Sequence, residues 1–253
     1  MQDGFVKRAL ALPFYRGLLP LLRRAGFARP SAYDWAAFYL QRNRIPVTYI
    51  ADVGAYDGET AAHLLALFPN AVAYAFEPAP ATFAALESRA RRQSRLKPFR
   101  LALSNQVGIA VLNVNRSPGT NSFLNSLHSP EMELQLQGGA ETLERVECPM
   151  TTLDEFLAAH PEFQPQLLKT DTQGFDLHVL EGARATLKNH VRAVVAEVRF
   201  AYPAYQDDTS RLDTLDAFLA AQGFRLFGIP AATAHRATHR AMEADALWVR
   251  DVS

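Results

Sequence analysis

The sequence has little cysteine and no long apolar stretch. Cys148 is the only cysteine among 253 residues, so no disulfide can form within the chain, and we expect a reducing, cytoplasmic location. Residues 5–27 are rich in apolar side chains, but one lysine, four arginines and two prolines interrupt them. This stretch therefore falls short of the ~20 consecutive apolar residues of a spanning helix, and we expect no transmembrane segment.

The sequence also lacks net charge. Its 26 Lys and Arg residues balance 26 Asp and Glu residues, so no overall field attracts it to nucleic acid or anionic lipid. We expect no nucleic-acid partner. Apolar residues make up 49% of the chain, which is ordinary for a folded domain with a sizeable core.

Two regions are expected. Residues 1–45 are predicted to form a helical appendage, and residues 46–253 one large domain. The appendage is expected to pack on this domain or on a second subunit, which makes a homo-oligomer one alternative. An amphipathic segment lying on a membrane surface is the other.

Two phosphate-binding motifs are missing. Tyr56 stands where a G-x-G-x-x-G motif needs its second glycine, and no G-x-x-x-x-G-K-[ST] loop occurs. Residues 47–53 instead read as a buried strand, followed by a turn with Gly54, Asp57 and Gly58. A helix over 59–68 and a second strand over 71–76 follow.

The second strand ends at Glu77, which points to a nucleoside ligand. In parallel sheets, an acidic residue at this place accepts hydrogen bonds from ribose hydroxyls at the carboxyl edge. The turn without a pyrophosphate-type glycine cluster argues against a dinucleotide. The turn and Glu77 resemble motif I and the acidic loop of class I S-adenosylmethionine-dependent methyltransferases. The resemblance implies a sulfonium cofactor, which has no pyrophosphate and whose methionine ammonium favours nearby carboxylates.

The rest of the chain alternates between strands and helices. We expect helices over 79–93, 175–189 and 212–222, and strands over 98–103, 166–171, 191–198, 224–229 and 246–250. Residues 107–114 and 145–150 are expected to form an inserted antiparallel hairpin with a long loop between them. The prediction is an α/β fold: a Rossmann-like, doubly wound, mainly parallel seven-stranded sheet with an antiparallel edge strand.

Several motifs carry a family resemblance over residues 47–200. In order, they are ADVGAYDGET, FEPAPATFAALES, LALSNQVGIAVLNV, TTLDEFL, LLKTDTQGFDLHVLEGA and VVAEV. The chain resembles the FkbM-type methyltransferases of the class I S-adenosylmethionine-dependent superfamily. The resemblance implies S-adenosylmethionine as cofactor. Together with the strand ends, it predicts cofactor contacts at Asp52, Gly54, Ala55, Tyr56, Asp57, Gly58, Glu77, Pro78, Ser104 and Asn105.

The strand LLKTD carries the candidate catalytic residues. Lys169 and Asp171 are two positions apart, so both project to one face of a strand whose surroundings ought to be apolar. They indicate either a site or a buried ion pair. Asp171 is our first candidate for the base, with Lys169 keeping it ionised. Glu197 ends the next strand and is the second candidate.

A polar loop over 118–132 is expected to cover the cofactor and the methyl acceptor, with a plain surface loop as the alternative. Its candidate residues are Asn121, Asn125, Ser126 and His128. We predict no metal site, because His235 and His239 lack a third ligand. A Mg²⁺ ion bridging Asp171, Glu197 and a diol acceptor is an open alternative.

The resemblance implies methylation of a hydroxyl group on a small molecule or glycan, such as a sugar or polyketide. The residues do not choose among these acceptors. Two other functions stay open: a non-catalytic module that binds an adenosine ligand, and, with less support, an NAD-dependent oxidoreductase.

Overall fold

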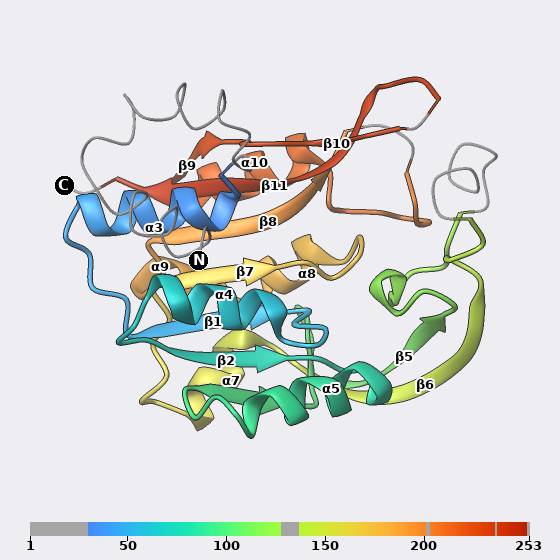
Figure 1. Ribbon diagram of the computed structural model, residues 1–253, viewed down its shortest axis with the longest axis horizontal. Helices are drawn as coiled ribbons and strands as arrows, with labels where there is room; N and C mark the ends of the chain where they lie inside the picture. The colour runs from blue at the N-terminus through green and yellow to red at the C-terminus, as the bar shows by residue number, and fades with distance from the viewer. Residues whose placement is uncertain (1–29, 128–136, 201–202, 236, 252–253) are drawn as a thin grey trace, which may run out of the picture.

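A mixed sheet forms the centre of the protein (Figure 1). The structure is a computed structural model, and it describes residues 30–127, 137–200, 203–235 and 237–251. The sheet has eight strands in the order β10-β11-β8-β7-β1-β2-β3, and β9 also pairs with β11. Its parallel strands are β1 (Tyr49–Val53), β2 (Val72–Phe76), β3 (Leu96–Phe99), β7 (Leu167–Thr170) and β8 (Ala193–Arg199).

The strands at one edge run antiparallel. They are β9 (Phe224–Gly228), the two-residue β10 (Thr233–Ala234) and β11 (Ala241–Arg250), which pairs with β8. Apart from the short β10, the sheet contains the seven strands expected. The predicted Rossmann-like fold class with an antiparallel edge is confirmed.

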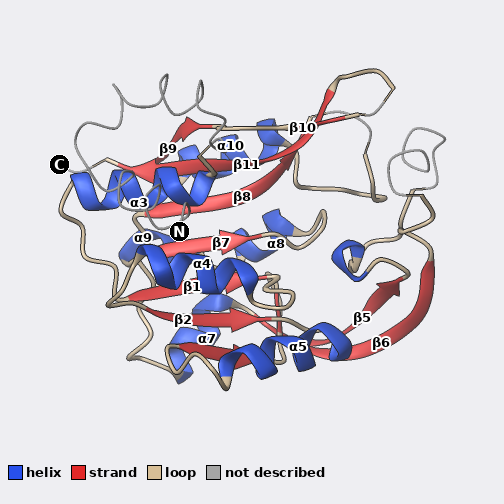
Figure 2. Cartoon of the chain, in the orientation of Figure 1, coloured by secondary structure: helices blue, strands red, loops and turns tan. Residues whose placement is uncertain are grey.

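Helices cover both faces of the sheet (Figure 2). On one face lie α3 (Ala32–Arg42), α4 (Glu59–Leu67) and α5 (Pro80–Ala90); on the other lie α7 (Leu153–Ala159), α8 (Asp176–Glu181), α9 (Arg184–Asn189) and α10 (Leu212–Ala221). Successive side chains of a strand point to opposite faces. Ile50 therefore joins the core under α3 and α4, while Ala51 joins the core under α7 to α10. This is the doubly wound arrangement.

Helix α3 lies on the appendage side of the predicted boundary at residue 45. Its residues Ala36 and Leu40 are fully buried, and they pack in the same core as Ile50 and Leu64. This helix is therefore part of the core of the described domain. Residues 1–29 lie outside the described residues, so the predicted appendage and its oligomer contact stay predictions.

A second, three-stranded sheet follows β3. It consists of β4 (Ala102–Leu103), β5 (Gly108–Asn115) and β6 (Thr142–Thr151), in the order β4-β6-β5. The antiparallel pairing of β5 with β6 confirms the inserted hairpin. The single strand expected over 98–103 is wrong, because the chain leaves the central sheet after Phe99 and β4 pairs with β6. A short 3-10 helix, η1 (Pro118–Thr120), lies in the loop after β5.

The single helix expected over 175–189 is also wrong. It is divided into α8 and α9, and α8 ends at Gly182. A Cβ atom on Gly182 would come within 1.8 Å of the Ser104 carbonyl oxygen. The helix is therefore interrupted where its backbone packs directly on the end of β4.

The order of the parallel strands reverses between β1 and β7. From β1 the chain continues to β2 and β3 on one side, and it later returns as β7 on the other side of β1. The two strands pair in register, with Asp52 opposite Lys169 and Val53 opposite Thr170. Ligands of doubly wound sheets bind at the carboxyl ends of the strands at such a reversal. No helix of the described segments has both the length and the apolar character needed to cross a membrane.

Candidate active site

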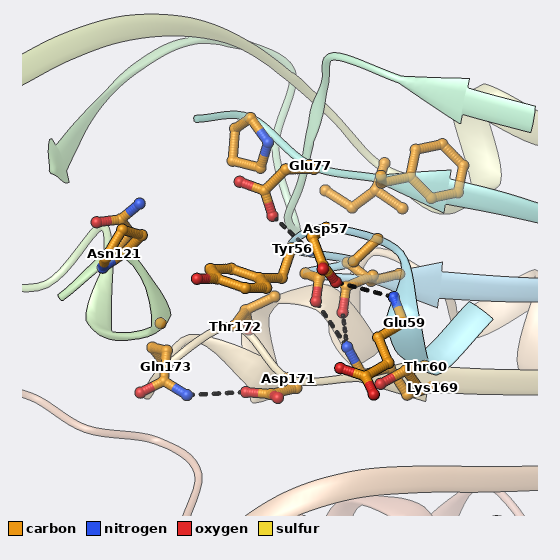
Figure 3. A pocket seen from close by; sticks show the side chains of 18 of the residues that line it. Tyr56, Asp57, Glu59, Thr60, Glu77, Asn121, Lys169, Asp171, Thr172 and Gln173 are labelled. Carbon is orange, nitrogen blue, oxygen red and sulfur yellow. Dashed lines mark hydrogen bonds between the residues drawn. The ribbon is translucent and has the colours of Figure 1, made fainter. Parts of the chain in front are cut away.

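A cavity of about 620 Å³ opens at the carboxyl ends of β1, β2 and β7 (Figure 3). Its volume lies within the range of ~300–1,000 Å³ that is usual for ligand pockets. Of the residues predicted from the sequence, those that line it are Gly54, Ala55, Tyr56, Asp57, Glu77, Pro78, Asn121, Lys169 and Asp171. The structure thus brings together the turn after β1, the end of β2 and the end of β7.

The turn after β1 depends on Gly54. Its φ is +71°, and a Cβ atom there would lie 1.9 Å from the Asp171 carbonyl oxygen. A side chain at this position would therefore push β1 and β7 apart. Two residues later, Tyr56 adopts a φ of +52°, a conformation that is uncommon for a non-glycine residue. Figure 3 shows its ring projecting into the space between Glu77 and Gln173.

Glu77 stabilises the same turn through hydrogen bonds. Its Oε2 atom accepts a hydrogen bond from the Tyr56 backbone N at 2.9 Å. Its Oε1 atom accepts from the Ala79 backbone N at 3.0 Å and from Thr82 Oγ1 at 2.8 Å. Burial raises the pKa of Glu77, while these hydrogen bonds and Lys169 oppose the rise. These three donors fix the carboxylate of Glu77, which lines the cavity.

Asp57 caps the following helix, because Gly58 at the N-cap of α4 has no side chain. Asp57 Oδ1 accepts from the Glu59 backbone N at 2.9 Å. Its Oδ2 atom forms a 2.8 Å ion pair with Arg89 on α5. Asp57 thus lines the cavity but is also a structural residue of the turn.

Lys169 pairs with Asp52. Its Nζ lies 3.0 Å from Asp52 Oδ1, and the two side chains are 3% and 0% exposed. The ammonium also donates to the Gly54 carbonyl oxygen at 2.6 Å. Burial lowers the pKa of Lys169, but the negative charges of Asp52 and Asp171 raise it above its usual value. Asp52 is therefore buried behind the cavity wall, and Lys169 links it to the Gly54 turn.

Asp171 lies at the end of β7 and is half-buried. Its backbone N donates to the Val53 carbonyl oxygen at 3.1 Å, which extends the pairing of β7 with β1 by one residue. Its Oδ1 atom accepts a 2.9 Å hydrogen bond from Gln173 Nε2, and Figure 3 shows the two side chains side by side at the cavity wall. Asp171 is the predicted base that the structure places in the cavity.

Glu197, the second candidate base, is not among the residues that line the cavity. Its Oε2 atom forms a 2.7 Å ion pair with Arg199, which also binds Asp208 at 3.1 Å and Glu243 at 2.9 Å. Burial raises the pKa of Glu197 well above its ordinary value, although Arg199 opposes the rise. A catalytic role for Glu197 stays a prediction, and the geometry favours Asp171.

Two predicted cofactor residues, Ser104 and Asn105, do not line the cavity. Ser104 is fully buried under Gly182, and Asn105 Nδ2 donates to Glu181 Oε2 at 2.8 Å. Their neighbours on the chain, residues 101–103, line the cavity instead. The chain leaves the central sheet after Phe99. The residues that line the cavity are therefore 101–103, which come just before Ser104 and Asn105.

Asn121 is the candidate residue of the predicted acceptor loop that lines the cavity. Its Oδ1 atom accepts from the Asn115 backbone N at 2.8 Å. Ser122 and Phe123 also line the cavity, whereas Asn125 and Ser126 do not. His128 lies outside the described residues.

Several lining residues were not predicted. Those on or beside helices α3 and α4 are Ser31, Tyr33, Asp34, Glu59, Thr60 and His63, and those after β7 are Thr172 and Gln173. Asp34 and His63 approach within 3.6 Å, which ties α3 to α4 at the cavity rim. The pKa of Asp34 is lowered because hydrogen bonds from His63 and Ser31 outweigh its burial. The first turn of α4 carried a sequence signal because it follows the glycine turn directly, and Thr172 and Gln173 lie within the motif LLKTDTQGFDLHVLEGA.

Within the described ranges, no group of three or more His, Cys, Asp or Glu residues is arranged to hold a metal ion. The bridging Mg²⁺ considered from the sequence stays an open alternative.

The fold and the cavity define a doubly wound α/β domain with a ligand site at its strand-order reversal. A family model, the methyltransferase FkbM domain, matches residues 52–226. This chain belongs to the FkbM methyltransferase family. No curated protein matches the chain.

Two solved structures are similar to the chain. An FkbM methyltransferase from Methylobacillus flagellatus KT is similar with a TM-score of 0.51 and 15% identity. The match covers 95% of this chain and 47% of that one, so the chain spans about half of that protein's length. A 1,6-didemethyltoxoflavin-N1-methyltransferase from Burkholderia thailandensis has a TM-score of 0.42, with 11% identity over 87% of this chain and 79% of that one.

Proposed function

We propose that this protein is an S-adenosylmethionine-dependent methyltransferase that methylates a hydroxyl group of a small molecule or glycan. The observation that carries the proposal is the position of Asp171. Its carboxylate lines the cavity at the reversal of strand order, beside the Gly54 turn and on the same cavity as Glu77. Membership of the FkbM family supports methyl transfer as the reaction.

The described residues fit the cofactor. Glu77 is fixed by three donors and offers its carboxylate to ribose hydroxyls. Phe76 and residues 101–103 supply an apolar wall that suits an adenine ring. Lining carboxylates such as Asp57 suit the positive charges of a sulfonium and a methionine ammonium.

When bound, S-adenosylmethionine supplies an electrophilic methyl carbon on a sulfonium. The protein's task is then to align the acceptor oxygen and to take its proton, because a neutral hydroxyl is a poor nucleophile. Asp171 is placed to accept that proton. Lys169 lies close enough to stabilise the ionised Asp171 by charge, while it is itself held by Asp52.

Asn121, Ser122 and Phe123 line the side of the cavity near Gln173. They combine an amide, a hydroxyl and an aromatic face, which are the groups that recognise polyhydroxylated molecules such as sugars. We assign this side to the acceptor. The cytoplasmic location, the lack of a nucleic-acid partner and the oligomer through residues 1–45 remain predictions from the sequence.

The proposal is tested by transfer of a radiolabelled methyl group from S-adenosylmethionine to a panel of hexoses, deoxyhexoses and catechols. The wild type and Asp213→Asn, which changes an exposed aspartate on α10, are expected to label the same acceptor. Asp171→Asn should bind the cofactor but lose about 100- to 10,000-fold in turnover, the usual contribution of a general base. Full turnover by Asp171→Asn would contradict the assignment of the base.

A further inference from the structure

Gln173 connects Asp171 to a buried ionic cluster. Its Nε2 atom donates to Asp171 Oδ1 at 2.9 Å and lies 3.4 Å from Glu197 Oε2. Its Oε1 atom accepts from Arg199 Nη2 at 3.1 Å and from the Tyr205 hydroxyl at 2.9 Å. Both polar atoms of the Gln173 side-chain amide therefore form hydrogen bonds, and their partners lie on three separate segments of the chain.

The orientation of the amide is determined by Arg199. A guanidinium group only donates hydrogen bonds, so it must face the oxygen of the amide. Nε2 is thereby directed to Asp171 and Glu197, which accept. Arg199 cannot easily turn away, because it is 8% exposed and is held by Glu197, Asp208 and Glu243.

The backbone of Gln173 is also constrained. Its φ is +53°, a left-handed conformation that is unfavourable for a non-glycine residue and persists where the surroundings enforce it. The Gln173 carbonyl oxygen accepts a 2.7 Å hydrogen bond from Ser122 Oγ. Ser122 lies in the segment assigned to the acceptor, so Gln173 contacts the acceptor side and the base at once.

We propose that Gln173 is a positioning residue for Asp171. Its amide holds Oδ1, and no hydrogen bond between the described residues engages Oδ2, which is left for the acceptor hydroxyl. The buried cluster of Arg199 with Glu197, Asp208 and Glu243 holds the Gln173 amide in its orientation through the hydrogen bond from Arg199. The inference rests on the proposed function, since it takes Asp171 as the group that accepts the proton.

Two substitutions separate this role from simple packing. Gln173→Glu keeps an oxygen for Arg199 and Tyr205 but replaces the donor to Asp171 with a negative charge. Gln173→Met has similar length and makes no hydrogen bond. Gln166→Glu is the matched control, because Gln166 Oε1 accepts from the Thr48 and Tyr49 backbone N atoms at the opposite end of β7.

The functional experiment measures two quantities for each variant. They are the kcat of methyl transfer to the acceptor that the wild type labels best, and the dissociation constant of S-adenosylmethionine. Gln173→Glu is expected to lose on the order of 100-fold in kcat, because the base is misplaced. Cofactor affinity and melting temperature should remain at the wild-type values. Gln166→Glu should retain full turnover. A Gln173→Glu variant with wild-type kcat, or one that loses kcat only together with cofactor affinity and melting temperature, overturns the proposal.

A spectroscopic arm needs no acceptor. The side-chain amide resonances of Gln173 are assigned in a ¹⁵N–¹H correlation spectrum by their loss in Gln173→Met. We expect them to be separated from those of exposed amides and to shift in Asp171→Asn. Amide signals that do not respond to Asp171→Asn would overturn the contact. If the contact is seen but Asp171→Asn retains turnover, the proposed base fails and the positioning of Asp171 by Gln173 has no catalytic role.

Discussion

Lys169 Nζ and Asp52 Oδ1 lie 3.0 Å apart, on side chains that are 3% and 0% exposed. The two residues stand opposite each other on the adjacent parallel strands β7 and β1. Lys169 also donates to the carbonyl oxygen of Gly54, the residue that starts the turn below the cavity. This pair therefore joins the two strands at the point where their order reverses and where the ligand is expected.

Removing one member of this pair should destabilise the protein strongly. Lys169→Met leaves the Asp52 carboxylate buried without its cation, which typically costs ~3–5 kcal/mol in the free energy of unfolding. Denaturant unfolding measures the loss. The double variant Asp52→Leu/Lys169→Met should be more stable than Lys169→Met alone. Equal or lower stability of the double variant would show that the two charges do not depend on each other.

Glu77 should contribute directly to cofactor binding. Glu77→Ala removes a charged acceptor for the ribose hydroxyls, and we expect it to weaken binding of S-adenosylmethionine by ~1–3 kcal/mol. Thr82→Val is the control, because it removes one hydrogen bond to Glu77 Oε1 and leaves the carboxylate in place. Calorimetry on both folded variants distinguishes the two effects. Loss of affinity in Thr82→Val equal to that in Glu77→Ala would assign Glu77 to bracing the turn alone.

Gly54→Ala should disrupt the cavity. The new Cβ atom would meet the Asp171 carbonyl oxygen at 1.9 Å, and the backbone there has a φ of +71°. We expect a lower melting temperature and loss of cofactor binding. Gly108→Ala on β5 is the comparison for backbone strain alone, since its φ is also positive, at +155°, and a Cβ atom there meets nothing within 4 Å. Wild-type cofactor affinity in Gly54→Ala would contradict the close approach of β1 and β7.

Titration of Glu197 should make the free energy of unfolding depend on pH. Burial raises its pKa well above the ordinary value of 4.5, although Arg199 opposes the rise. The folded protein then keeps a proton that the unfolded chain has lost, so stability falls as the pH rises from about 4.5 through the folded pKa.

Glu197→Gln removes this titration, and the decline of the free energy of unfolding over that pH range should become shallower. Glu141→Gln, which changes an exposed partner of Arg116, should keep the wild-type slope. Denaturant unfolding at a series of pH values measures both. An unchanged slope in Glu197→Gln would mean that Glu197 is ionised in the folded protein throughout the range.

Much of the fold could be predicted because its signals are local. The strand ending at Gly54, the helix after Gly58 and the strand ending at Glu77 each follow from periodicity and turn residues within a few positions. The break between β3 and β4 was missed because it depends on pairing of β4 with β6, about 50 residues away. The break at Gly182 was missed because it depends on contact with Ser104.

The part of the candidate site that lies at strand ends could be predicted from the sequence. Gly54, Glu77 and Asp171 stand at strand ends, where the topology of a parallel sheet brings them together. The partner of Lys169 was not predictable, because Asp52 is its neighbour only through the register of β1 with β7. Tyr33 and Asp34 reach the cavity because α3 packs across the sheet, which no local pattern in residues 1–45 indicates.

Calorimetric titration of the purified chain with S-adenosylmethionine, S-adenosylhomocysteine and NAD distinguishes a methyltransferase cofactor site from a dinucleotide site. We expect the first two ligands to bind with micromolar dissociation constants and NAD not to bind, because the turn at Gly54 lacks a pyrophosphate motif. Absence of binding by both adenosyl compounds, or preferential binding of NAD, would contradict a methyltransferase cofactor site in this cavity.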